Sequence, residues 1–289
     1  MSFVHLLKSA CYHPPKLSAA PVLPDLQLTQ IHKLDPQRVA NYHRLVAWRP
    51  GIAAVIHPNY VQVLSFPMQM AMMSSHPFPF KTLGLVHLAN DIKINFLPEQ
   101  VSVIELRTSF TKLQIHKRGY VIGVSTRAYV QDKLAIEASS DYLARSRHTH
   151  LASDSHLQDY EKTPVPNLDS AKFDTELAFA SNSGRQYARV SNDFNPIHLS
   201  ALSAKMFGFK RAIIHGMFSK ALCVSRLISG EPARISASFL QAIYLPSAVR
   251  LSSQSVVQGQ ALIFALSSEQ QNKQSIHLHG RIEYGVKAP

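Results

Sequence analysis

Apolar and polar positions along the chain predict the same succession of elements twice. In the first part, residues 26–31 are strand-like, and a short helix is expected from about residue 36 to residue 47, after an N-capping aspartate and a proline at the first helical position. Residues 60–73 are apolar nearly all round, which predicts a central, buried helix. Residues 85–144 contain four β-rich runs separated by turn residues, which indicates an antiparallel meander.

The order of elements repeats in the second part of the chain. Residues 175–180 are strand-like, residues 183–190 favour a helix, residues 215–228 predict a second buried helix, and strands are expected between about residues 233 and 284. This succession is typical of α+β layers in which an antiparallel sheet wraps a long apolar helix. Two copies predict a pseudo-dimer within one chain. The duplication rests on the order of elements, because the two parts share no letter-by-letter identity.

Polar and proline-rich stretches mark the expected domain boundaries. Residues 1–25 are rich in proline and weakly patterned, so we expect them to form an arm over the surface. Residues 147–170 are polar and contain several histidines and prolines, as is typical of a linker. The two domains are then expected at residues 26–146 and 171–289.

The first long helix contains a proline and a group of methionines. Because Pro67 removes a backbone donor, the helix is expected either to kink there or to begin late. Met68, Met70, Met72 and Met73 are compatible with a cofactor site, but flexible packing in a core is the more common role of such residues.

Composition is that of a soluble globular protein. The chain has 289 residues, and its two cysteines, Cys11 and Cys223, suggest no disulfide framework and fit a reducing compartment. Residues 50–80 lack charged side chains, but prolines and polar residues break the stretch, so it fails as a membrane span. The N-terminus has no apolar run fit for a secretory signal, and we expect a cytoplasmic protein.

The chain is strongly basic, with a formal net charge of +12 and a pI near 9.8. Such a charge attracts polyanions in general, including nucleic acid, the phosphates of CoA or an acidic protein. The basic residues are scattered and form no long run, so nucleic-acid binding is not expected.

Candidate chemistry is concentrated between residues 187 and 217. Asp193 and His198 are the candidate catalytic pair, because an imidazole titrates near neutrality and a carboxylate can take a proton or hold a water. Between them, Asn195-Pro196 predicts an extended turn that can direct both side chains into one cavity. The alternative is that Asp193 and Asn195 are turn or capping residues and His198 is an ordinary polar residue on the following helix.

His215-Gly216-Met217 stands at the start of the second buried helix. The first turn of a helix offers free backbone N–H groups, and Gly216 has no side chain to block a ligand, so its N–H can face a developing oxyanion. The alternative is a helix start that needs glycine for close packing. His215 is expected to be an N-terminal cap or a packed residue, not a catalyst.

The sequence contains no motif for metal binding, phosphate binding or serine-hydrolase chemistry. No cluster of histidine, cysteine or acidic residues has metal-ligand spacing, no glycine-rich phosphate loop follows a strand, and no serine lies in a nucleophile-elbow frame. We therefore expect neither a metal nor a cofactor.

The part of the chain that carries this candidate chemistry resembles the MaoC-like, (R)-specific enoyl-thioester hydratase family. The resemblance covers residues 175–260 and is carried by Tyr187, Asp193, Asn195-Pro196, Ile197-His198, Ala204, Phe207-Gly208, His215-Gly216-Met217, Phe239 and Pro246. It implies the hot dog fold, and a double hot dog for a chain of this length, whose first half lacks the catalytic pair. One departure is Asn192, where the family commonly has glycine.

The resemblance also implies the role of each residue. Asp193 and His198 would hold one water, Asn195 would order the turn, and the Gly216 N–H would polarise the thioester carbonyl. We assign Met217, Phe207 and Gly208 to substrate binding.

The expected activity is reversible syn hydration of a trans-2-enoyl thioester to an (R)-3-hydroxyacyl thioester of CoA or acyl carrier protein. The apolar helix at residues 60–73 would either line a tunnel for a medium to long acyl chain or leave the space that such a tunnel needs. The alternatives are a hot dog thioesterase and a non-catalytic acyl-thioester-binding subunit. The protein is expected to be a monomeric double hot dog or a homodimer.

Overall fold

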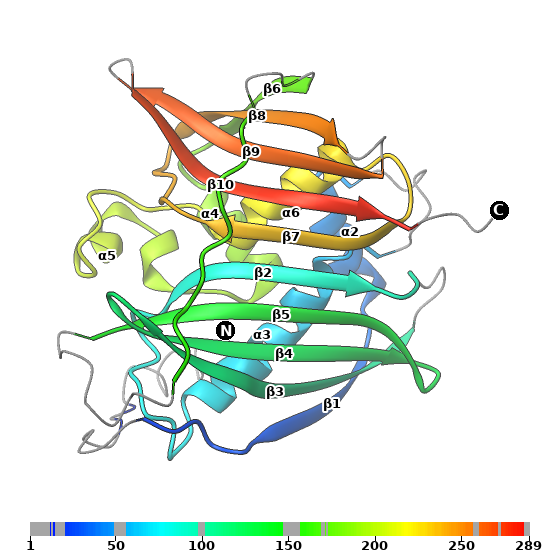
Figure 1. Cartoon of the computed structure of the whole chain (residues 1–289), viewed down its shortest axis with the longest axis vertical. Coiled ribbons are helices and arrows are strands. Elements are labelled where there is room, and N and C mark those ends of the chain that lie inside the picture. The colour runs from blue at the N-terminus through cyan, green and yellow to red at the C-terminus, as the bar shows by residue number, and fades with distance from the viewer. Residues whose placement is uncertain are drawn as a thin grey trace.

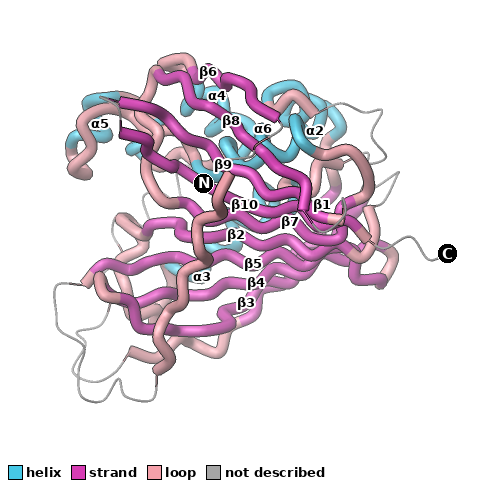
Figure 2. Tube along the Cα trace, turned by 45° about the horizontal axis from the view of Figure 1, so that its top comes forward, coloured by secondary structure: helices cyan, strands magenta, loops and turns pink. Residues whose placement is uncertain are grey.

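The structure is a computed structural model that describes residues 12, 14, 21–48, 56–97, 102–146, 157–168, 171, 173–256, 260–270 and 273–285. One continuous sheet of ten antiparallel strands curves around two long helices, which lie on the same face of the sheet (Figures 1 and 2). The predicted α+β class and the double hot dog architecture are confirmed, but the two sheets expected around the two helices are joined into one.

Within the described residues, the first half contributes five strands and two helices. They are β1 (Gln27–Lys33), α2 (Pro36–Leu45), α3 (Tyr60–Met73), β2 (Val86–Ile94), β3 (Val103–His116), β4 (Gly119–Val130) and β5 (Lys133–Arg145).

The part of the second half that the structure describes contributes five strands, three α-helices and a 3-10 turn. They are β6 (Phe173–Phe179), α4 (Ser183–Ser191), the turn η2 (Pro196–His198), α5 (Ala201–Lys205), α6 (Gly216–Leu227), β7 (Pro232–Phe239), β8 (Ser247–Val256), β9 (Ala261–Gln270) and β10 (Lys273–Tyr284).

The strand order shows the internal duplication. It runs β1-β3-β4-β5-β2-β7-β10-β9-β8-β6. Counted from the centre outward, each half therefore places its second, fifth, fourth, third and first strands in the same order. The two halves meet where β2 pairs with β7, from Ala89 opposite Ser238 to Lys93 opposite Arg234. We call this pair of strands the seam.

The predicted meander is right for three strands and wrong for the fourth. β3, β4 and β5 pair in sequence order, but β2 pairs with β5 and β7 instead of β3. This placement brings β2 to the centre of the sheet, where it can pair with the second half.

α3 begins at Tyr60, so the prediction that Pro67 delays the helix is wrong, and the proline lies inside it. The helix is buried on nearly every side, as its apolar sequence predicts. Met72 and Met73 are fully buried and pack in the core, in line with their expected role.

The linker crosses the face of the sheet opposite the helices (Figure 1). It is attached there through Ile115, whose N–H donates to the Gln158 carbonyl at 2.9 Å and whose carbonyl accepts from the Tyr160 N–H at 2.7 Å. Most of the predicted arm lies outside the described residues. The domain boundaries stay predictions. Within the described part of the chain, no helix has the length and apolar character needed to cross a membrane.

Candidate active site

The turn that carries the candidate pair begins where α4 ends. Asn192 closes the helix in the left-handed conformation, with φ of 61°. Asparagine tolerates this region better than most residues, so Asn192 can end the helix at the position where the MaoC-like family commonly has glycine. The next N–H, that of Asp193, donates to Ser191 Oγ at 3.2 Å. The turn is therefore closed despite the departure at Asn192.

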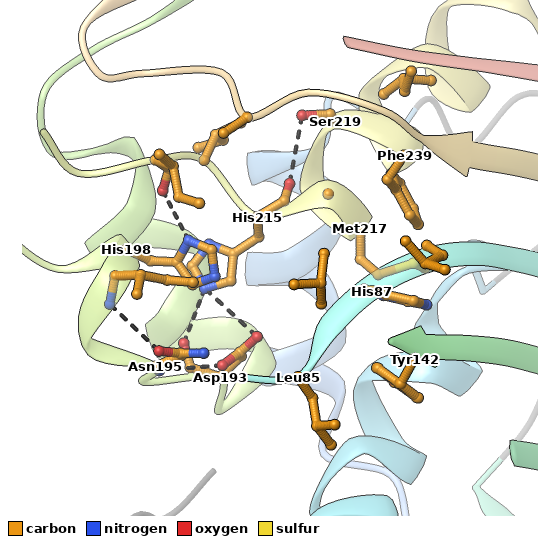
Figure 3. Close-up of a pocket in the computed structure, with 18 of the residues that line it drawn as sticks. Leu85, His87, Tyr142, Asp193, Asn195, His198, His215, Met217, Ser219 and Phe239 are labelled. Atoms are coloured by element: carbon orange, nitrogen blue, oxygen red, sulfur yellow. Dashed lines mark hydrogen bonds and ion pairs between the residues drawn. The ribbon is translucent and has the colours of Figure 1, made fainter. Parts of the chain in front are cut away.

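Asp193 and Asn195 stabilise the turn by accepting backbone hydrogen bonds. Asp193 Oδ1 accepts from the Asn195 N–H at 3.2 Å, and Asn195 Oδ1 accepts from the Ile197 N–H at 3.4 Å. These are the capping roles that an Asp-x-Asn-Pro sequence predicts. Asp193 Oδ2 faces the neighbouring histidines, 3.9 Å from His215 Nε2 (Figure 3). The capping role and a catalytic role are thus compatible in one carboxylate.

His198 lies in η2, and a backbone contact fixes its ring. Its Nδ1 is 2.8 Å from the Ile213 carbonyl oxygen. Because a carbonyl only accepts, Nδ1 carries the proton of the neutral ring and Nε2 remains an acceptor. Burial lowers the pKa of His198, against the opposing charge of Asp193. The ring is therefore neutral at neutral pH, the state that a general base requires.

Gly184 in α4 allows the His198 backbone to approach that helix closely. A Cβ at residue 184 would lie 2.1 Å from the His198 carbonyl oxygen, which leaves no room for any side chain. The sequence analysis missed this residue. Its available signal was a glycine inside an amphipathic helix, where glycine carries a cost in stability.

The structure also brings His215 into the site, although the sequence predicted only a cap or a packed residue. Its side chain makes no capping hydrogen bond. Its ring stacks on His198, with centroids 3.6 Å apart and an interplanar angle of 27°, and its Nε2 is 3.0 Å from the Asp193 carbonyl oxygen. Burial and the neighbouring His198 lower the pKa of His215. It is a second neutral imidazole that holds the Asp193 turn.

One ligating atom from each of Asp193, His198 and His215 lies within 4.8 Å of the others. This arrangement does not suit a metal ion. An imidazole lone pair lies in the ring plane, so two stacked rings hold their lone pairs in separate, nearly parallel planes instead of directing them at one point. Nδ1 of His198 and Nε2 of His215 are also engaged by backbone carbonyls. A water fits better, since it can bridge polar atoms that each lie about 2.8 Å away.

Gly216 is the first residue of α6. The first N–H groups of a helix have no intrahelical partner, and within the described residues none is found for the Gly216 N–H. A Cβ on Gly216 would lie 2.9 Å from the ring of Phe239. Both predicted reasons for glycine, close packing and an accessible N–H, therefore apply.

Asp193, His198 and Gly216 line one cavity of about 390 Å³. Asn195, Phe207 and Met217 line the same cavity, whereas Gly208 does not. Gly208 instead adopts a φ of 83° in the turn after α5.

The first half supplies much of the cavity wall, both through the helix at residues 60–73, which the sequence predicted to line a tunnel, and through strand residues that the sequence did not single out. Gln62, Phe66 and Met70 come from α3, His87 from β2 and Tyr142 from β5. The His87 ring stacks on Tyr142, with centroids 4.6 Å apart, opposite the Asp193 turn in Figure 3. The half without the candidate pair therefore shapes the candidate site of the other half.

Charged residues at the cavity are mostly cations from the first half and the linker. Among the described residues that line it, Arg118, Arg145 and Lys162 are the lysine and arginine side chains, and Asp193 is the acidic one. All three cations are solvent-exposed. We call them the basic rim. It offers an anion-binding edge to an otherwise largely apolar cavity.

Comparisons with known proteins agree with this architecture. Residues 167–277 match the sequence model of a family described as MaoC like domain. The chain is 28% identical over 251 residues to 3-hydroxyacyl-thioester dehydratase X of Mycobacterium tuberculosis, covering 86% of each chain. The crystal structure of HtdX from the same organism is similar with a TM-score of 0.72 and 23% identity, covering 90% of this chain and 100% of that one. Another M. tuberculosis protein, described as having a double hot dog fold, gives a TM-score of 0.59 and 11% identity over 91% of this chain and 96% of that one.

Proposed function

Since residues 167–277 of this double hot dog chain are a MaoC-like dehydratase domain, we propose that the protein is a hydro-lyase that interconverts trans-2-enoyl and (R)-3-hydroxyacyl thioesters. The relative that matches 86% of the chain is named as a 3-hydroxyacyl-thioester dehydratase. The observation that carries the proposal is the shared cavity of a carboxylate, a neutral imidazole with a free acceptor nitrogen, and an unblocked helix N-terminus.

In the hydration direction, Asp193 and His198 hold one water over C3 of the enoyl group. His198 Nε2 takes a proton from this water as its oxygen bonds to C3, and the C2=C3 electron pair moves to the thioester oxygen. The imidazolium then returns the proton to C2 on the same face, while the carbonyl re-forms. Asp193 orients the water through the oxygen that faces the two rings. Dehydration reverses these steps.

The Gly216 N–H stabilises the enolate oxygen that forms between the two steps. It stands at the positive end of α6, and the surrounding cavity is partly apolar, so the interaction is less screened than it would be in water. This donor acts on charge that develops in the transition state, which is where stabilisation raises kcat.

The acyl chain extends from the site toward α3, where Phe66 and Met70 line the cavity. This direction favours medium to long chains, because the half without a catalytic pair adds wall and volume instead of a second site. The basic rim of Arg118, Arg145 and Lys162 would meet the phosphate of the carrier, whether CoA or the phosphopantetheine arm of acyl carrier protein.

Hydration of crotonyl-CoA and of longer enoyl-CoA thioesters, followed by the loss of enoyl absorbance, tests the proposal. Replacing Asp193 with Asn or His198 with Gln should lower kcat by about 10²-fold or more, because the first variant loses the carboxylate that orients the water and the second loses the imidazole that transfers the proton. His32→Gln on β1 is the matched control, since that histidine lies outside the cavity lining. Turnover that survives at both Asp193 and His198 contradicts the assignment.

Two alternatives have their own signatures in the same assay. A thioesterase releases free thiol, and a non-catalytic binding protein retains acyl-CoA with neither product. The pH profile is a further test. Because the pKa of His198 is lowered by burial, kcat should hold as pH falls through 6.5 and decline only below it, as the ring gains a proton.

A further inference from the structure

Lys220 is a fully buried lysine in the second turn of α6, four residues after Gly216. Among the described residues, it is the one Lys, Arg, Asp or Glu that falls in the buried class. Burying a cation is costly, and nothing in the mechanism above uses it. Its environment therefore calls for a functional explanation.

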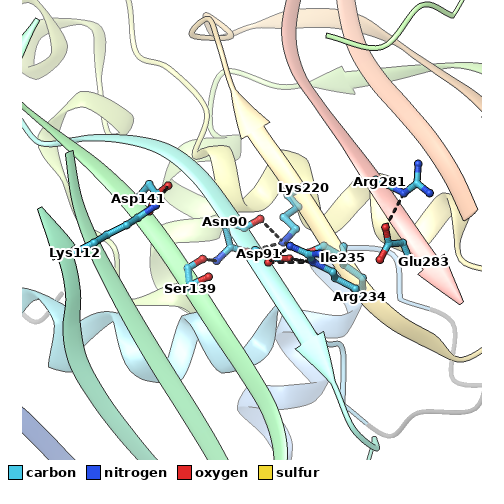
Figure 4. Close-up of polar contacts among 10 residues, drawn as sticks. All are labelled: Asn90, Asp91, Lys112, Ser139, Asp141, Lys220, Arg234, Ile235, Arg281 and Glu283. Carbon is cyan, nitrogen blue, oxygen red and sulfur yellow. Dashed lines mark hydrogen bonds and ion pairs between the residues drawn. The ribbon is translucent and has the colours of Figure 1, made fainter. Parts of the chain in front are cut away.

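Three oxygen atoms surround its ammonium group (Figure 4). Lys220 Nζ donates to Asn90 Oδ1 at 2.5 Å, to the Asn90 carbonyl at 3.3 Å and to the Ile235 carbonyl at 3.1 Å. An ammonium has three donors and no acceptor, so three acceptors match its protonated form. No carboxylate is among these hydrogen-bond partners.

These contacts tie α6 to both strands of the seam. Asn90 lies on β2 of the first half and Ile235 on β7 of the second, and the two strands pair with each other. Farther along the same strands, His87 of β2 lines the cavity and Phe239 of β7 packs against Gly216. Lys220 thus connects α6, which carries the oxyanion donor, to two strands that also contribute to the cavity.

The placement of the charge is unfavourable for the helix by itself. The N-terminal end of a helix is electrically positive, so a cation close to it is repelled and an anion is preferred. The same repulsion becomes useful when a negative charge develops at the Gly216 N–H. A buried cation adds its potential to that of the helix end in a medium that screens it weakly.

We propose that Lys220 is a positioning residue for the reaction: its ammonium holds the start of α6 against the seam and raises the positive potential that the enolate oxygen meets. The inference rests on the proposed function. It predicts that the protonated form of Lys220 is the active one.

Charged and titratable neighbours set the protonation of this lysine. Burial lowers the pKa of Lys220 to about 7, and the charge of Asp91 raises it. Asp91 is itself bound by Arg234 on β7, at 2.7 Å. The positive charge of Lys220 also contributes to lowering the pKa of His57 and His87. Because these pKa values are about 3, both rings are neutral where Lys220 titrates.

The test is the pH dependence of enoyl-thioester hydration. In the wild type, kcat should fall as pH rises through about 7, where the ammonium loses its proton. Lys220→Met should lower kcat about tenfold at low pH with KM within threefold, and should abolish this alkaline decline. Arg226→Met is the matched control, because it removes an exposed cation from the last turn of the same helix. It should keep both kcat and the decline.

Asn90 variants retain the lysine and test the same proposal if Lys220→Met does not fold. Asn90→Ala removes one acceptor and should move the alkaline decline to lower pH, whereas Asn90→Asp adds a negative charge and should move it to higher pH. A decline that stays in place in both variants, or an unchanged profile in a folded Lys220→Met protein, overturns the proposal. A wild type without hydratase activity would instead refute the proposed function, and this inference with it.

Discussion

Replacement of Gly184 by alanine should displace His198 and lower activity, although Gly184 itself does not touch substrate. The new Cβ would lie 2.1 Å from the His198 carbonyl oxygen, and ordinary contact begins at 3.4 Å. The two atoms must therefore separate by about 1.3 Å, and neither can rotate away, because the Cβ position is fixed by the α4 backbone and the oxygen belongs to the His198 backbone. α4 leads directly into the Asp193 turn, so a shift between α4 and η2 changes the position of His198 relative to Asp193.

A displacement of about 1 Å in a catalytic group can cost about 10²-fold in rate, which corresponds to about 2.7 kcal/mol in activation free energy. We expect Gly184→Ala to lower kcat for enoyl-CoA hydration by about this factor, with a smaller change in KM. Steady-state kinetics provide the measurement, and thermal unfolding monitored by circular dichroism separates misplacement from loss of folded protein.

Gly230→Ala is the matched control, because a Cβ there would meet its nearest neighbour, on Tyr284, at 3.9 Å. It should retain wild-type kinetics and thermal stability. A folded Gly184→Ala protein with kcat within twofold of the wild type would show that the contact between α4 and His198 does not set the catalytic geometry.

Three further predictions concern the surroundings of the site. His215→Phe keeps a ring beside His198 but loses the Nε2 contact with the Asp193 carbonyl, so kcat should fall about tenfold; a fall in stability alone would assign His215 a purely structural role. Met70→Trp should reduce kcat/KM for long enoyl-CoA thioesters and leave crotonyl-CoA unaffected, because the added rings fill the cavity near α3; equal effects on both chain lengths would place the acyl chain elsewhere. The free energy of unfolding should rise with pH between about 7 and 10, by up to about 1.4 kcal/mol per pH unit, because unfolded Lys220 binds a proton in this range that the native lysine has lost. Denaturant titrations at several pH values measure the slope, and Lys220→Met should lack this contribution.

Much of the architecture could be predicted because it depends on local patterns. The apolar residues of α3 and the alternating runs of β3, β4 and β5 predicted a helix and strands near their observed positions. The repeated order of elements predicted the duplication, which the strand order confirms. The pairing of β2 was not predictable in this way, since a strand's sequence records which face is buried but not which strand lies beside it.

The sequence by itself determined the long helices, most of the strands and the hydrogen-bonded turn at Asp193 and Asn195, because helix and strand periodicity and turn geometry are properties of neighbouring residues. Only the tertiary structure decided that His215 stacks on His198, that Gly184 supports it, that α3 and β2 of the first half wall the cavity, and that Lys220 joins α6 to the seam. These contacts join residues that lie from 14 to 130 positions apart, and they exist only once a continuous sheet has folded around both helices. No local pattern carries that information.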